Sequence, residues 1–131
     1  MEVNVTIGLN VAIVAVTDNA PRILTIRRLD HSSPGRGDFE ALPFGPLDPG
    51  GGQTLEKELQ GWVSEQTGLE LGYVEQLYTF GDRNRDPSER RGGPRVLSIA
   101  YLALIIETEE GIGGRAKWQD YYAFLPWEDW R

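Results

Sequence analysis

An α/β (α+β) fold is predicted by two features of this 131-residue sequence. The first is an amphipathic helix over residues 54–67, in which Leu55, Leu59 and Val63 recur every four residues and form an apolar stripe. The second is a set of apolar segments with the composition of β-strands. These segments span residues 3–17, 22–28, 71–80 and 95–106. A β-sheet with one principal helix packed against it accommodates both features.

The composition predicts a single domain over residues 1–131. With 40% hydrophobic and 25% charged residues, a chain of this length suffices for one core and is short for two. A formal net charge of −7 argues against a general nucleic-acid binder, because phosphate contacts need a basic surface. We therefore expect no direct nucleic-acid contact by this domain.

The sequence favours a cytoplasmic protein. It contains no cysteine, which excludes a disulfide framework and cysteine metal sites. The N-terminus has no basic start, and the longest apolar run there, Val11 to Val16, is far shorter than the ~20 residues of a membrane span. We expect neither secretion nor membrane insertion.

The first two strands are predicted to form a hairpin. Apolar residues occupy the odd positions from Val3 onward, and the segment becomes apolar on both faces toward Thr17. Residues 17–21 have turn composition, and residues 22–28 follow as the second strand. The polar segment 29–38 holds the only histidine, His31, which is more typical of solvated surface than of a general base.

The principal helix follows a short extended segment, residues 39–44, and a loop rich in proline and glycine. Thr54 is a suitable N-cap and Gly68 ends the helix. The backbone amides of such a loop and the positive end of the helix suit a phosphate or pyrophosphate. Glu56 and Glu58 have the spacing of an ordinary solvated helix face.

Two further strands are predicted on either side of a long polar loop, residues 81–94. The second of them, residues 95–106, is almost continuously apolar, as in a central strand covered on both faces. Arginines are concentrated in and beside the loop, and guanidinium groups suit phosphate and carboxylate ligands. They are Arg83, Arg85, Arg90, Arg91 and Arg95. We assign Arg85 to ligand binding, and Arg90 and Arg91 to a solvated loop balanced by nearby acids.

The C-terminal tail is rich in aromatic residues. Such density is typical of a packed cover over a sheet, and otherwise of a contact with a partner. The residues are Trp118, Tyr121, Tyr122, Phe124, Trp127 and Trp130.

Residues 42–69, LPFGPLDPGGGQTLEKELQGWVSEQTGL, resemble the Nudix box and its preceding Leu-Pro-x-Gly segment. The positions that match are Leu42, Pro43, Gly45, Val63, Glu65, Gly68 and Leu69. The sequence departs from the box where Gly61 and Trp62 replace an Arg-Glu pair and Gln66 replaces the second acid of a Glu-Glu pair. The loop after Gly45 is also longer than in the box.

In the Nudix family, three carboxylates on one helix face hold a divalent metal against a diphosphate. Glu65 alone keeps its acid at those positions, so it is the only candidate catalytic and metal-binding residue of the box. Glu58 lies seven residues earlier, a rise of about 10 Å, which is too far to bind one ion directly beside Glu65. Trp62 either plugs the former metal site or offers a stacking surface.

A second resemblance, over residues 77–87 and 95–101, is to the N-terminal Nudix-like domain of Nudix-related transcriptional regulators of NAD metabolism. It implies a Nudix-like α/β/α sandwich with a mixed β-sheet. It also implies a homodimeric sensor that binds ADP-ribose or a related nucleotide without hydrolysis, requires no cofactor, and signals to a DNA-binding domain. An active Nudix hydrolase using magnesium or manganese, with Glu56 or Glu58 assisting Glu65, is the alternative. A scaffold with a vestigial pocket is the third.

The predicted ligand site lies between residues 42–45, the helix face at Trp62 and Glu65, and the arginine loop. Backbone amides near Gly45 and the arginine side chains are the donors for a pyrophosphate. Asp86 accepts from a ribose hydroxyl, and an aromatic ring stacks on adenine. The arginines are Arg27, Arg83 and Arg85, and the aromatic residues are Phe44, Tyr78 and Phe80.

Overall fold

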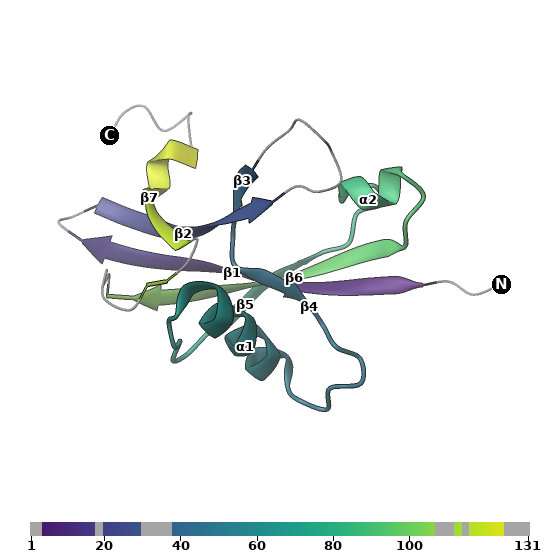
Figure 1. Ribbon diagram of the computed structural model, residues 1–131, viewed down its shortest axis with the longest axis horizontal. Coiled ribbons are helices and arrows are strands. Elements are labelled where there is room, and N and C mark those ends of the chain that lie inside the picture. Colours follow the sequence, from purple (N-terminus) through teal and green to yellow (C-terminus); the bar gives the residue numbers. More distant parts are fainter. Residues whose placement is uncertain (1–3, 18–19, 30–37, 107–111, 114–115, 125–131) are drawn as a thin grey trace.

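A computed structural model describes residues 4–17, 20–29, 38–106, 112–113 and 116–124 (Figure 1). The strands are β1 (Val5–Thr17), β2 (Ala20–Leu29), β3 (Asp38–Ala41), β4 (Phe44–Pro46), β5 (Glu75–Phe80), β6 (Arg95–Ile105) and β7 (Ala116–Asp120). The helices are α1 (Leu55–Thr67), the four-residue α2 (Pro87–Arg90) and a 3₁₀ turn at Tyr121–Phe124.

The strands form one mixed sheet, as predicted. β1 and β6 run parallel, in register from Val5 opposite Arg95 to Ala15 opposite Ile105. Every other pairing is antiparallel, and the main strand order is β3-β2-β1-β6-β5. Because β1 lies in the middle of this order, its long apolar sequence is covered by neighbours along both edges.

β1 changes its neighbour along its length. Its first half pairs with β4 at residues 8–10, and its second half forms the predicted hairpin with β2 at residues 14–17. Beyond the hairpin, β2 pairs with β3 and β7 instead. β4 therefore occupies the place beside β1 that β2 has left, which brings the loop before α1 to the centre of the sheet.

The core lies between α1 and one face of the sheet. Alternate residues of β1 are buried there, as are Tyr101 and Ala103 at the matching register of β6. Leu59 and Val63 of α1 are fully buried, while Leu55 is half-buried against this core. The buried β1 residues are Leu9, Val11, Ile13 and Ala15. The predicted helix stripe is thus confirmed. Figure 1 shows α1 lying against the sheet.

Local sequence signals set the ends of α1. The side chain of Thr54 accepts a hydrogen bond from the backbone amide of Lys57, as an N-cap does. Gly68 ends the helix with a φ of 78°, a left-handed conformation that favours glycine. Both caps agree with the prediction.

The later strands depart from prediction in two ways. Residues 71–74 are not part of a strand, and β5 begins at Glu75. β6 is central but not covered on both faces throughout, since Leu104 is 71% exposed. The reason is that α1 covers one face only, and α2, the other α-helix within the described part, is a single turn.

The aromatic tail is partly a cover, as predicted. Trp118 in β7 is buried in the core beside Leu24 of β2, with which it is in register. Tyr121 and Tyr122 are half-buried, whereas Phe124 is 49% exposed. His31, Trp127 and Trp130 lie outside the described residues. No helix in the described ranges has the length and apolar character needed to span a bilayer.

Candidate functional site

The helix positions that carry acids in a Nudix box hold α1 against the edge of β4. The side chain of Gln66 forms two hydrogen bonds with the backbone of Phe44. Gln66 Nε2 donates to the Phe44 carbonyl at 2.6 Å, and the Phe44 backbone N–H donates to Gln66 Oε1 at 3.1 Å. One turn earlier, Trp62 Nε1 donates to the carbonyl of Pro46 at 3.1 Å. These bonds satisfy peptide groups on the edge of β4 that faces away from β1.

The indole of Trp62 also packs directly on Gly45. A Cβ atom built on Gly45 would lie 2.1–2.3 Å from three ring atoms of Trp62, well inside van der Waals contact. Glycine is therefore required at this position for close approach. The indole of Trp62 is thus held against β4 by both Gly45 and Pro46.

An acidic residue of α1, Glu58, holds the loop before the helix. Glu58 Oε1 accepts a hydrogen bond from the backbone amide of Asp48 at 3.0 Å, and Asp48 Oδ1 accepts from the amide of Gly50 at 2.9 Å. Glu58 thus has a structural partner, in contrast to the solvated face predicted for it. Glu56 is exposed, as predicted.

Glu65 is exposed on α1, and the neighbouring acids of the box are absent. Within the described ranges, no group of three or more His, Cys, Asp or Glu residues is placed to hold a metal ion. Hard divalent cations require several oxygen ligands, and the residues on this face of α1 do not supply them. The described residues therefore do not fit the metal that the fold implies.

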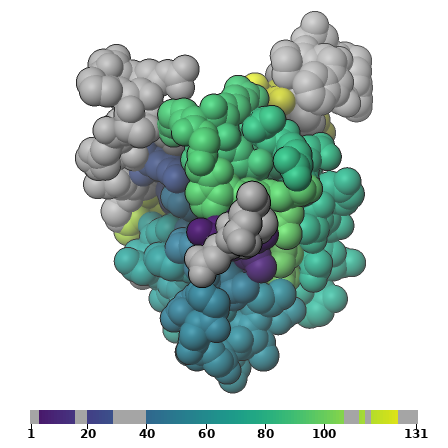
Figure 2. All heavy atoms as spheres, turned by 90° about the vertical axis from the view of Figure 1, so that its right-hand side faces the viewer, coloured from purple at the N-terminus to yellow at the C-terminus, as the bar shows by residue number. Residues whose placement is uncertain are grey.

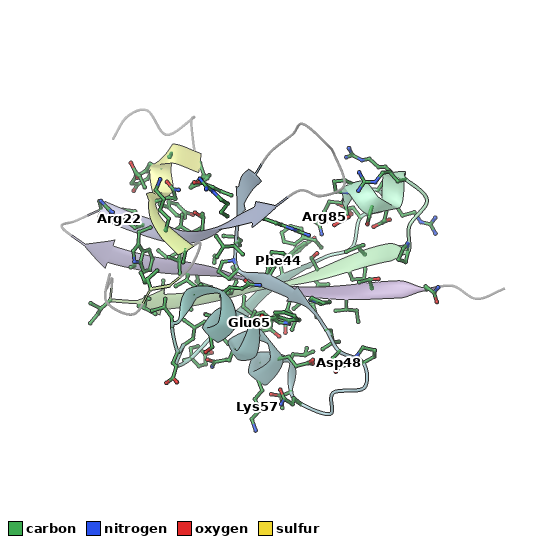
Figure 3. The ribbon with its side chains drawn as sticks, viewed as in Figure 1. Arg22, Phe44, Asp48, Lys57, Glu65 and Arg85 are labelled. Atoms are coloured by element: carbon green, nitrogen blue, oxygen red, sulfur yellow. The ribbon has the colours of Figure 1, made fainter. Side chains whose placement is uncertain are left out.

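A different set of side chains gathers on the opposite side of the sheet. Successive strand residues point to opposite faces, so Phe44 is directed away from Trp62 while Gly45 contacts it. The guanidinium carbon of Arg28 lies 4.0 Å from the centroid of the Phe44 ring. Figure 3 shows Phe44 and Arg85 on one side of the sheet and Glu65 on the helix side.

Arg85 lies on the same face through two contacts with neighbouring strands. Its NH2 group donates to the Ser98 hydroxyl at 2.6 Å, and its guanidinium carbon lies 5.2 Å from the centroid of Phe80. Phe80 makes an edge-to-face contact with Tyr78, with centroids 4.8 Å apart. The guanidinium has five donors, so most remain available to an anion.

The carboxylate of Asp86 interacts electrostatically with both Arg85 and Arg28. The Ser88 hydroxyl and amide donate to Oδ1 at 2.7 and 2.9 Å, and these bonds lower the pKa of the carboxyl. The charges of Arg85 and Arg28 lower the pKa further, while partial burial opposes them. The second oxygen, Oδ2, stays available as an acceptor.

The structure brings together only part of the predicted site. Phe44, Tyr78, Phe80, Arg85 and Asp86 share one face, whereas Trp62 and Glu65 lie on the α1 side of β4. Arg28, not the predicted Arg27, contacts Phe44. Arg27 is opposite Glu40 in the β2–β3 pairing. Arg83 is exposed, and Gly45 is buried beneath Trp62.

The missed residues are Arg28 and Ser98. Arg28 follows Arg27 directly, and only the direction of its side chain distinguishes the two. Ser98 is a small polar residue in the otherwise apolar β6, and that contrast is a signal the sequence does contain.

In Figure 2 the green loop of residues 81–94 lies above the start of β1, and the blue loop before α1 lies below it.

The comparison with solved structures shows that this chain has the Nudix fold. The Nudix domain of Shewanella oneidensis NrtR, complexed with ADP-ribose, superposes with a TM-score of 0.74 at 22% identity, covering 94% of this chain and 77% of that one. A second S. oneidensis NrtR structure gives 0.73 at 22% identity, over 92% of this chain and 54% of that one. A MutT/nudix family protein from Enterococcus faecalis gives 0.70 at 21% identity, over 92% and 45%.

These comparisons confirm the predicted Nudix-like resemblance at the level of the fold. This chain spans about half the length of the second NrtR structure and of the E. faecalis protein. No protein-family model matches the sequence, and no curated protein matches it significantly.

The contact between Gly45 and Trp62 predicts opposite effects for two glycine substitutions. Gly45→Ala should lower the free energy of unfolding by about 1–3 kcal/mol, because the new methyl group overlaps the indole. Gly61→Ala should raise it by about 0.5–1 kcal/mol, since a Cβ there meets nothing within 4 Å and alanine favours the helix. Urea unfolding of both variants measures the two effects. Equal stability of Gly45→Ala and the parent protein would contradict the packing described.

Proposed function

We propose that this chain is a ligand-sensing Nudix-like domain that binds an ADP-ribose- or NAD-related nucleoside diphosphate derivative without hydrolysing it. The observation that carries the proposal is the gathering of Arg28, Phe44, Phe80, Arg85 and Asp86 on the sheet face opposite α1. We place the ligand on this face. Trp62 and Glu65, which the sequence assigned to the same site, then lie behind it.

The chemistry of these side chains suits such a ligand. Two guanidinium groups supply several donors to a pyrophosphate. Phe44 and Phe80 each lie beneath a guanidinium, and Phe80 is 40% exposed, so its ring is accessible to a base or ribose. Asp86 stays ionised because its pKa is lowered, so Oδ2 accepts a hydrogen bond from a ribose hydroxyl.

The structural neighbours support the choice of ligand. The NrtR Nudix domain superposed on this chain is a complex with ADP-ribose, and NrtR has also been solved with a 27mer DNA. We therefore propose that this domain acts within a cytoplasmic transcriptional regulator. With a formal net charge of −7, the domain is not the part expected to contact DNA.

The proposed lack of hydrolysis is supported by the residues that stand in place of the acids of the box. Trp62 and Gln66 form hydrogen bonds with β4, so they are committed to holding α1 in place. Glu65 remains, and a single carboxylate is a poor site for magnesium or manganese. We propose that binding requires neither ion.

Arginine removal tests the ligand site. Arg85→Ala should weaken binding of ADP-ribose roughly ten- to a hundredfold, because a charge-assisted hydrogen bond contributes about 1.5–3 kcal/mol. Arg91→Ala is the matched control, since Arg91 is exposed in the same loop and should bind like the parent protein. Titration calorimetry measures both. No heat from the parent protein with millimolar ADP-ribose or NAD, or an unchanged Arg85→Ala affinity, would remove the site assignment.

The second prediction concerns turnover. The parent protein should leave ADP-ribose intact in the presence of magnesium or manganese, because one acid stands where the family uses three. Chromatography of the nucleotide products measures this. Robust release of AMP that is lost in Glu65→Gln would show instead that the chain is a working Nudix hydrolase.

We further propose a homodimer, with β5 as its contact surface. Among the described strands, β5 pairs with β6 alone, so no described strand pairs with its other edge, and all six of its residues are exposed. Leu77 of β5 and the preceding Tyr73 are 53% and 83% exposed. An open edge with apolar side chains pairs readily with another strand, and in a symmetric dimer that strand is a second β5.

Light scattering at tens of micromolar should give a mass near twice 14.7 kDa. Leu77→Lys should shift the protein toward the monomer, since a lysine on an edge strand opposes pairing. A monomer mass for the parent protein would exclude the dimer, and a dimeric Leu77→Lys variant would place the contact elsewhere.

A further inference from the structure

One carboxylate links two separate parts of the segment between β5 and β6. Glu89 Oε2 accepts a hydrogen bond from the backbone amide of Asn84 at 3.0 Å, and Oε1 accepts from the amide of Val96 at 2.9 Å. One side chain therefore joins the first part of the loop to the beginning of β6. These two bonds lower the pKa of Glu89, so the carboxyl is ionised at neutral pH.

The residue that Glu89 holds directly precedes Arg85. Asn84 has a φ of 61°, a left-handed conformation that a non-glycine residue adopts at a cost. Its amide is bound by Glu89 and its carbonyl accepts from Arg90 Nε at 2.9 Å. Because both peptide groups of Asn84 are bound, the direction in which the chain enters Arg85 is set.

The intrinsic stability of α2 does not explain why the loop has this fixed conformation. α2 has four residues, and a single turn has little stability of its own in water. The loop instead depends on side-chain bonds to its backbone, including Arg95 NH2 to the Gly81 carbonyl at 2.7 Å. Two of the side chains that bond to the loop backbone are anions. Asp86 accepts from the amide of Ser88, two residues away, whereas Glu89 connects Asn84 to Val96. An anion near the arginines opposes the binding of another anion.

From this geometry we infer that Glu89 is a positioning residue for the nucleotide ligand, which acts by presenting Arg85 and Asp86 and does not itself touch the ligand. The inference rests on the proposed function. It also predicts that neutralising Glu89 lowers the affinity for the ligand, whereas simple electrostatics predicts that the affinity rises. Removing a negative charge near an anion site strengthens binding by Coulomb's law, whereas loss of the loop anchor weakens it.

Glu89→Gln tests the inference, because it keeps the shape of the side chain and removes the charge and one acceptor. Titration calorimetry with ADP-ribose should show affinity lowered about tenfold. Asp82→Asn is the matched control, since Asp82 is an exposed acid of the same loop; its affinity should be equal to the parent value or slightly higher. Affinity in Glu89→Gln equal to or higher than that of the parent protein would overturn the inference.

A double-mutant cycle separates positioning from general stabilisation of the fold. If Glu89 acts through Arg85 and Asp86, Glu89→Gln should weaken binding less in the Arg85→Ala background than in the parent protein, because only the part that acts through Asp86 is left to lose. Additive losses would contradict the coupling.

Hydrogen exchange of the free protein gives a readout without ligand. The amides of Asn84 and Val96 should exchange faster in Glu89→Gln, and unchanged exchange would show that the bonds do not hold the loop. A parent protein that gives no heat with ADP-ribose overturns the proposed function together with this inference. A parent protein that binds, with an unaffected Glu89→Gln variant, overturns the inference alone.

Discussion

The fixing of α1 to the outer edge of β4 is the constraint on which the rest of the structure depends. Four residues of helix rise about 6 Å, and two residues of strand span about 6.7 Å. Trp62 and Gln66, four residues apart, can therefore reach Pro46 and Phe44, two residues apart, on the same edge. The match in spacing lets a helix satisfy the edge of a strand that no further strand covers.

This arrangement determines what lies on each side of the sheet. Gly45 must face the indole, because only glycine fits against it. Phe44 must then face the other way, where the guanidinium of Arg28 covers its ring. The aromatic surface of the proposed site is thus fixed from behind by the same residues that replaced the acids. The same contacts therefore hold α1 in place and set the direction of Phe44 in the proposed site.

The parts of this structure that depend on local signals could be predicted from the sequence. Thr54 and Gly68 mark the ends of α1 because capping involves backbone groups within a few residues. Arg28 could not be distinguished from Arg27, because Leu24, Thr25 and Ile26 are all buried and the alternation that assigns a strand residue to a face is interrupted. The bonds of Glu89 to Asn84 and Val96 join residues up to seven positions apart through a backbone path that no periodicity describes.

Hydrogen bonds made by the acids of this loop also bear on how an acidic chain could hold the proposed anionic ligand. The composition of the loop suggested that its acids form ion pairs with its arginines. Such ion pairs would neutralise the arginines. In the structure Glu89 accepts hydrogen bonds from backbone amides, and these are the main reason that its pKa is lowered. Asp86 accepts hydrogen bonds from the hydroxyl and the amide of Ser88, and the bond from the hydroxyl is the main reason that its pKa is lowered. A carboxyl with a lowered pKa in the folded state stabilises that state above its ordinary pKa, and this contribution is lost as the pH falls through the folded value. At neutral pH the loop therefore keeps its shape by using its own acids, and the donors of Arg85 that remain after its bond to Ser98 are left for a ligand.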